Sequence, residues 1–123
     1  MTPRLWIVPV ELFGPKGSHI ICAAIDTGAT TSLIPPEALI AIGCDPALST
    51  ERAQILTVTS REYLALVRVP EISALGRRIQ NLEVMSHALP FSSAVNGLLG
   101  MDFLLQIPEF RTLDKRFQKF LIN

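Results

Sequence analysis

The segment Ile25-Asp26-Thr27-Gly28-Ala29-Thr30-Thr31-Ser32 decides how the rest of this 123-residue chain is interpreted. It follows an apolar run, residues 20–25, and places a carboxylate before a glycine turn and several hydroxyl side chains. A strand that ends on Asp26 leaves that carboxylate partly desolvated at the foot of a tight loop, within reach of backbone N–H groups. Functional sites use such surroundings to orient a carboxylate. The alternative is an Asx-turn, in which Asp26 only caps its loop.

The composition indicates one globular unit, and we expect residues 1–123 to form a single domain with one core. Its 11 basic and 11 acidic side chains balance to zero net charge, so there is no electrostatic case for binding nucleic acid or an anionic membrane. No apolar run approaches the roughly 18 residues that a membrane-spanning helix needs. The N-terminus also lacks the features of a signal peptide, which makes a cytoplasmic location the default expectation.

Short strand-like segments follow one another closely along the chain. Residues 5–13 and 19–25 predict a hairpin around a Gly/Pro-rich turn, and this hairpin delivers Asp26. Pro9 cannot donate to a ladder, so it places the first strand at an edge or at a bulge. Further strands are expected at residues 33–34, 54–59, 63–69, 72–75, 79–85, 110–113 and 117–122, with short helices at 35–43 and 101–106. This succession predicts a mainly β barrel or sandwich.

Other chemistry-bearing residues do not form a convincing second site. His19 and Cys22 are three residues apart in one strand, so their side chains point to opposite faces, and the chain has no C-x-x-C pair; we therefore expect no metal ion. Cys22 lies in the apolar run and is interpreted as a small core residue. Asp102 is expected to cap or solvate its short helix.

Two segments, taken together, resemble the retropepsin-like aspartic proteases and, more narrowly, their single-domain bacterial members. Residues 26–35, which begin Asp-Thr-Gly-Ala, fit the active-site segment of that family. Residues 97–104, Gly-Leu-Leu-Gly-Met-Asp-Phe-Leu, fit its hydrophobic-hydrophobic-glycine segment and the following helix. The hairpin around Ser60-Arg61 lies where such proteins carry a flap. The resemblance implies an all-β fold, a closed acid-protease barrel with one or two short helices.

The resemblance also implies a role for individual residues. Asp26 would be the catalytic carboxylate, Thr27 would reach across a dimer axis, and Gly28 would admit a substrate backbone that a Cβ would obstruct. The remaining candidates would bind substrate, from the active-site loop, the flap and the wall beside it: Ala29, Thr30, Thr59, Ser60 and Leu98.

The implied activity is that of an aspartic endopeptidase, which needs no cofactor. Two carboxylates that share one proton can activate water and protonate the substrate. One chain supplies a single Asp-Thr-Gly, so a two-fold homodimer would have to bring Asp26 to its symmetry mate, with a peptide or protein as substrate. A non-catalytic peptide-binding or dimerisation module on the same fold, and a monomer in which Asp26 only caps its loop, are the alternatives.

Two departures from the retroviral pattern affect these expectations. Thr30 and Met101 stand where retroviral members commonly have an Asp and an Arg that form an ion pair. Support for the loop must therefore come from packing and from hydroxyl hydrogen bonds. The flap tip around Ser60 also lacks glycine, which predicts a stiffer, shorter or more open flap.

Overall fold

The computed structural model describes residues 6–56, 58–89, 94–108 and 110. Within them the strands are β1 (Ile7–Gly14), β2 (Gly17–Ile25), β3 (Leu33–Ile34), β4 (Arg52–Leu56), β5 (Arg61–Ala74), β6 (Arg77–Ser86) and β7 (Gly97–Leu99). The helices are α1 (Pro36–Ala41), α2 (Met101–Leu104) and the single 3-10 turn η1 (Pro46–Leu48). The predicted closing hairpin of residues 110–113 and 117–122 lies outside the described residues, except for residue 110.

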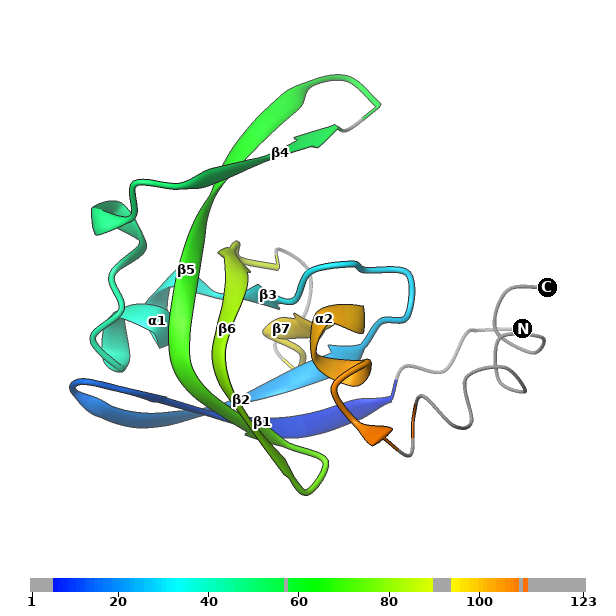
Figure 1. Cartoon of the computed structure of the whole chain (residues 1–123). Helices are drawn as coiled ribbons and strands as arrows, with labels where there is room; N and C mark the ends of the chain where they lie inside the picture. Colours follow the sequence, from blue (N-terminus) through cyan, green and yellow to red (C-terminus); the bar gives the residue numbers. More distant parts are fainter. Residues whose placement is uncertain (1–5, 57, 90–93, 109, 111–123) are drawn as a thin grey trace, which may run out of the picture.

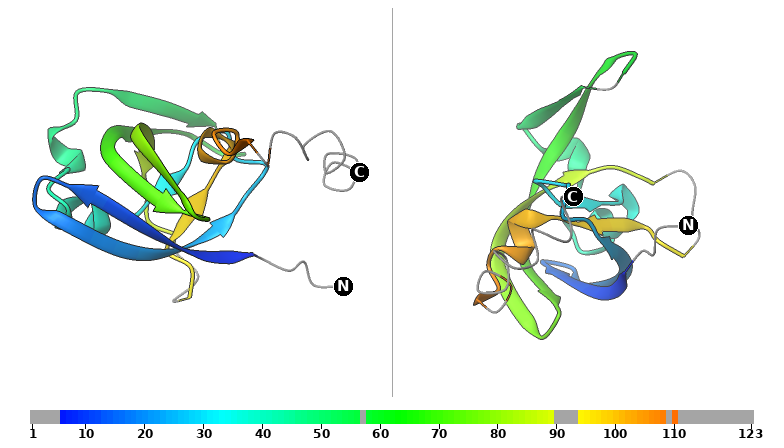
Figure 2. Two further views of the ribbon diagram at one scale, coloured as in Figure 1. Left: turned by 60° about the horizontal axis from the view of Figure 1, so that its bottom comes forward. Right: turned by 90° about the vertical axis from the view of Figure 1, so that its right-hand side faces the viewer.

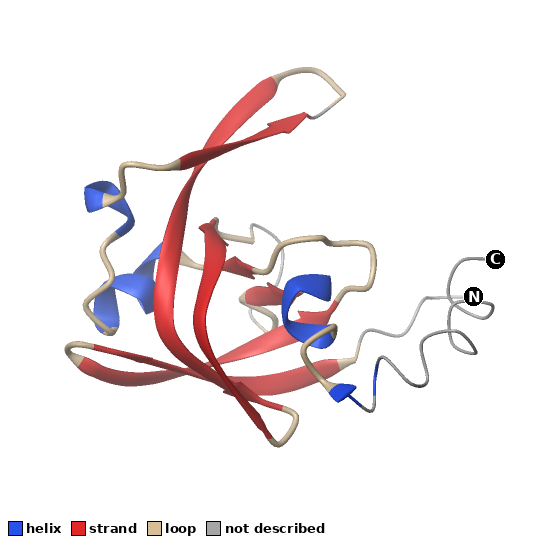
Figure 3. Cartoon of the chain, viewed as in Figure 1, coloured by secondary structure: helices blue, strands red, loops and turns tan. Residues whose placement is uncertain are grey.

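The strands form one sheet that closes on itself. Their order is β1-β2-β7-β3-β6-β5-β4, and a further pairing between β1 and β5 closes the first six into a barrel (Figures 1 and 3). β4 stays outside the barrel and pairs with β5 (Figure 1). The expected all-β closed barrel with short helices is confirmed. In the described part of the chain no helix is long and apolar enough to cross a membrane.

The core of the barrel is built from alternating strand positions, because successive side chains of a strand point to opposite faces. In β1, for example, Val10 and Leu12 are buried while their neighbours are more exposed. The inward face continues through the other strands and is closed by α1 and α2. Its fully buried large side chains are Val10, Leu12, Ile21, Ile34, Leu39, Ile42, Val69, Ile72, Val84, Leu99, Phe103 and Leu104.

β5 is a single strand of 14 residues, whereas the sequence predicts two strands separated around Pro70. The register with β6 is constant on both sides of Pro70, but the Pro70–Asn81 pair is missing from the ladder. Asn81 adopts a left-handed backbone conformation, φ 56°. The buried positions also change phase there, from Val69 to Ile72. A proline therefore sits inside a long strand because its partner, too, leaves the ladder at that point.

Pro9 fits the expected edge position. It faces Cys22 in the β1–β2 hairpin, and the second partner of β1, strand β5, joins only at residues 11–13. The missing N–H of Pro9 therefore lies where β1 has one strand neighbour.

The helix α1 docks onto the β1–β2 hairpin through its C-terminal end. Lys16 N–H donates to Ile42 O at 3.0 Å, and a Cβ on Gly14 would lie only 2.3 Å from the same oxygen. Gly43, which ends the helix, has φ 88°, a conformation that favours glycine. The structure thus has the predicted helix, over Pro36–Ala41 rather than the expected 35–43, with proline at its start and glycine after its end.

The structure overturns the interpretation of Cys22 as a core residue. Cys22 is exposed, because its side chain points outward from β2 between the inward-facing Ile21 and Ala23. A continuous apolar run does not reveal which of its positions face the core, since hydrophobicity alone fixes no phase.

The two cysteines should therefore differ in reactivity. Burial raises the pKa of the Cys44 thiol, which lowers its thiolate fraction, whereas Cys22 is exposed. We expect iodoacetamide to modify Cys22 about tenfold faster than Cys44 at pH 8, as followed by mass spectrometry. In the Cys22→Ser variant only the slow phase should remain, and equal rates for the two thiols would contradict the placement of Cys22.

Candidate functional site

Asp26 lies where β2 leaves the barrel. Its N–H donates to Leu99 O at 3.0 Å, so the residue continues the ladder between β2 and β7. The chain then turns: Gly28 N–H donates to Asp26 Oδ1 at 2.9 Å, and Ala29 N–H donates to Asp26 O at 3.2 Å. The Asp26 side chain is half-buried. The result is a carboxylate with one oxygen held by the backbone and a face still open to solvent.

β7 lies beneath both ends of the loop that carries Asp26. It runs parallel to β2, with Ala24 opposite Leu98, and antiparallel to β3, with Leu33 opposite the same Leu98. Leu98 is half-buried between these two strands, and Leu99 is fully buried. β2 and β3, the two strands that flank the loop, thus both pair with β7, which lies in the predicted hydrophobic-hydrophobic-glycine segment.

The start of α2 is fastened to the same loop by backbone hydrogen bonds. Met101 N–H donates to Ala29 O at 2.8 Å, and Asp102 N–H donates to Thr30 O at 3.2 Å. A Cβ on Gly100 would lie 2.7 Å from Ala29 O, so only glycine allows this close approach. Main-chain bonds therefore join the two segments that carry Thr30 and Met101, where an ion pair is absent, although neither bond links these two residues to each other.

A buried polar network lies behind the loop, and sequence reasoning missed it. Ser32 is fully buried; its N–H donates to Asp102 Oδ2 at 2.9 Å and its hydroxyl donates to Asp102 Oδ1 at 2.7 Å. Ser32 Oγ also accepts from Gly100 N–H at 2.9 Å, and Phe103 N–H donates to Asp102 Oδ1 at 2.8 Å. Asp102 lies in the first turn of α2, whose N-cap is Gly100 without a side-chain cap, and its main partner is Ser32 of the loop that carries Asp26.

One cavity adjoins the loop. It has a volume of about 480 Å³ and is lined by Thr30, Met101, Asp102, Leu105 and Gln106. Thr30 is exposed at its border, while Thr27 and Ala29 are half-buried nearer to Asp26. The structure thus brings together Asp26, Thr27, Gly28, Ala29, Thr30 and Leu98 around one loop.

The two remaining candidates, Thr59 and Ser60, lie elsewhere. Both are exposed at the tip of the hairpin formed by β4 and the first part of β5, which projects from the barrel and is drawn apart from the Asp26 loop (Figures 1 and 2). The same hairpin exposes the apolar side chains of Leu56, Val58 and Tyr63. The structure thus has a flap-like arm that does not cover the loop.

Among the described residues, no three His, Cys, Asp or Glu side chains gather closely enough to hold a metal ion. The carboxylates near the loop are Asp26 and Asp102, and Asp102 is occupied by its three N–H and O–H donors. Asp26 is therefore the carboxylate of this loop that is available for chemistry.

Comparisons with known proteins agree with this geometry. Residues 16–106 match the family described as gag-polyprotein putative aspartyl protease. Among solved structures, the chain is similar to the crystal structure of a retropepsin-like aspartic protease from Rickettsia conorii, with a TM-score of 0.63 and 17% sequence identity. That likeness covers 84% of this chain and 79% of the other, and it establishes a retropepsin-like fold. No curated protein sequence matches the chain.

Proposed function

Because the chain belongs to the gag-polyprotein putative aspartyl protease family, we propose that it is an aspartic endopeptidase that works as a homodimer. The observation that carries the proposal is Asp26 itself. Its carboxylate is half-exposed and oriented by Gly28 N–H, on a loop fixed by β7 and α2. We treat residues 1–123 as one single-lobe domain, which supplies one Asp-Thr-Gly sequence.

In the proposed reaction, Asp26 of two protomers meets on a two-fold axis. Two carboxylates about 3 Å apart cannot both ionise at low cost, so the pair holds a single proton. The ionised carboxylate takes a proton from water as the water attacks the peptide carbonyl, and the protonated one donates to the carbonyl oxygen. Thr27 is proposed to reach across the axis, and Gly28 to let the substrate backbone approach the dyad.

The proposed substrate is an extended peptide segment that lies between the loop and the arm. Ala29, Thr30 and Leu98 would contact it from below, and Thr59 and Ser60 from above. An extended peptide gains affinity from main-chain hydrogen bonds, while pockets for alternate side chains select its sequence. The exposed apolar side chains of the arm are a further source of contact area with a substrate.

Activity should depend on protein concentration in a way that a one-chain enzyme does not. If two chains build each active site, the specific activity falls on dilution below the dimer dissociation constant, because monomers lack half of the dyad. The measurement is hydrolysis of a fluorogenic peptide library over a 1000-fold dilution range, about 10 µM to 10 nM, alongside sedimentation at the same concentrations. Specific activity that stays constant while the protein becomes monomeric would contradict the homodimer.

The same library separates the enzyme from a binding module. A module on this fold retains peptides without cutting them, which equilibrium binding followed by mass spectrometry detects. Retention of intact peptides by a proven dimer, at every pH between 3 and 8, would overturn the proposed hydrolysis.

A further inference from the structure

The arm formed by β4 and the first part of β5 leaves the barrel at one residue, Leu66. From Leu66 onward β5 pairs with β6, beginning at Leu66 opposite Met85. Before Leu66, residues 61–65 pair only with β4 among the described strands. The arm is therefore a two-stranded hairpin whose β5 side continues into the barrel, whereas its β4 side reaches the barrel only through the segment after η1.

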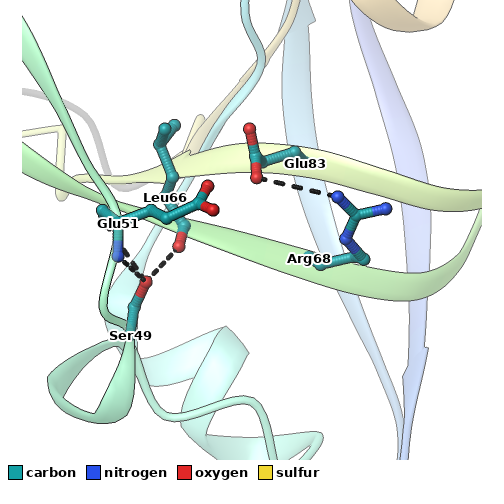
Figure 4. Close-up of polar contacts among 5 residues, drawn as sticks. All are labelled: Ser49, Glu51, Leu66, Arg68 and Glu83. Atoms are coloured by element: carbon teal, nitrogen blue, oxygen red, sulfur yellow. Dashed lines mark hydrogen bonds and ion pairs between the residues drawn. The ribbon is translucent and has the colours of Figure 1, made fainter.

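A hydroxyl group fastens the β4 side at that same residue. Ser49 Oγ donates to Leu66 O and accepts from Glu51 N–H at 3.3 Å (Figure 4). In addition, Leu66 N–H donates to Glu51 O at 2.9 Å. Both main-chain polar groups of Leu66 are thus bound to residues 49–51. Since these residues directly precede β4, the contact closes the base of the arm.

The neighbouring ion pair cannot replace this contact. Arg68 and Glu83 are 4.0 Å apart, and their side chains are 65% and 38% exposed (Figure 4). Exposed pairs of this kind contribute little, because water screens them. Moreover, both residues belong to strands of the barrel, so their attraction does not act on the β4 side.

The arm is small, so its direction depends on the contacts at its base. A two-stranded hairpin is marginally stable in water on its own, and this one exposes Leu56, Val58 and Tyr63 rather than packing them. Its direction relative to the barrel depends on what holds its base. Pairings between neighbouring strands also connect the base to the site: Leu66 faces Met85, Met85 faces Leu33, and Leu33 faces Leu98.

We propose that Ser49 is a positioning residue, which sets the direction of the arm relative to the Asp26 loop through its hydroxyl contact with Leu66. This inference rests on the proposed function, since it assigns the arm the task of covering bound peptide. Ser49 lies at the far end of the arm from its tip and acts through the backbone of Leu66. Without the hydroxyl, only the Leu66–Glu51 hydrogen bond and the β4–β5 ladder hold the base of the arm, so its direction is less fixed and peptide binding has to order it.

The test compares Ser49→Ala with Ser49→Thr, which keeps the hydroxyl, and with Ser18→Ala, the same chemical change at an exposed position of β2. Hydrogen exchange without substrate is the first readout. In Ser49→Ala we expect the amides of residues 52–56 and 61–66 to exchange about 3- to 10-fold faster, as loss of one hydrogen bond predicts. The amides of β1 and β2 should be unchanged, and Ser49→Thr and Ser18→Ala should both behave as the unsubstituted protein.

The second readout is kinetic. Ser49→Ala should raise KM for a peptide about 3- to 10-fold with kcat changed less than about twofold, and Ser49→Thr should restore KM. Unchanged exchange in the arm, or a fall in kcat with KM unchanged, would overturn the proposal. The exchange experiment needs no catalysis, so a protein that cuts no peptide refutes the proposed function and leaves the positioning role of Ser49 to be decided by exchange alone.

Discussion

Replacing Asp26 by Asn is expected to reduce peptide hydrolysis by at least about 10³-fold while the barrel stays folded. Asn has nearly the same shape and keeps an oxygen that can accept from Gly28 N–H, now 2.9 Å from Oδ1. It cannot take a proton from water, so the acid–base pair is lost. Initial rates at high enzyme concentration, with circular dichroism and thermal unfolding as controls for folding, measure the effect.

Mixing the Asp26→Asn chain with the unsubstituted chain tests the shared site directly. At equal amounts and after subunit exchange, about one quarter of the dimers contain two Asp26 residues. If both carboxylates are required, the mixture has about half the activity of the same amount of unsubstituted chain alone. The reason is that half of the unsubstituted chains then lie in inactive mixed dimers. If each Asp26 works independently in its own protomer, mixing leaves that activity unchanged, and if one Asp26 suffices for a shared site, activity rises about 1.5-fold, because mixed dimers are then active too. Full activity of Asp26→Asn itself would contradict any catalytic role for this loop.

The parts of the fold that could be predicted are those with strong local signals. The β1–β2 hairpin follows from its Gly/Pro turn, and α1 follows from proline at its start and Gly43 at its end. The placement of Asp26 directly after a strand could be predicted because an apolar run ends there in a carboxylate and a glycine. In each case, a few adjacent residues determine the local conformation.

The parts that could not be predicted depend on contacts between distant residues. The Ser32–Asp102 hydrogen bond joins positions 70 residues apart, and no local sequence feature of either residue predicts this pairing. The outward direction of Cys22 depends on the phase of β2 in the barrel, and the unbroken β5 depends on Asn81 across from Pro70. One feature of the sequence does point to the Ser32–Asp102 bond. Because Thr30 and Met101 cannot form an ion pair, the loop needs a hydroxyl group for support, and Ser32 is the hydroxyl residue of the loop that the fold buries.

Replacing Asp102 by Ala should cost the protein about 3 kcal/mol of its free energy of unfolding. The carboxylate accepts from Ser32 N–H, Ser32 Oγ and Phe103 N–H, and Ser32 is fully buried, so the substitution leaves three donors without their protein acceptor. Urea unfolding measures the loss. Asp45→Ala is the matched control, because Asp45 is an exposed carboxylate that accepts one N–H, from Ala47, at the start of η1. We expect that control to lose about 1 kcal/mol.

The loss at Asp102 should also reach the chemistry, because the same network holds the two chain segments that support Asp26. Ser32 Oγ binds Gly100 N–H, and Gly100 lies against Ala29 O. In the proposed homodimer a looser loop no longer holds the two Asp26 carboxylates at a fixed separation, so kcat should fall by about 10- to 100-fold in a folded Asp102→Ala protein. Ser32→Ala should follow the same direction with a smaller loss, since the Asp102 carboxylate then retains Ser32 N–H and Phe103 N–H. Unfolding free energies equal to that of Asp45→Ala, with kcat unchanged, would show that the buried network neither stabilises the barrel nor orients its loop.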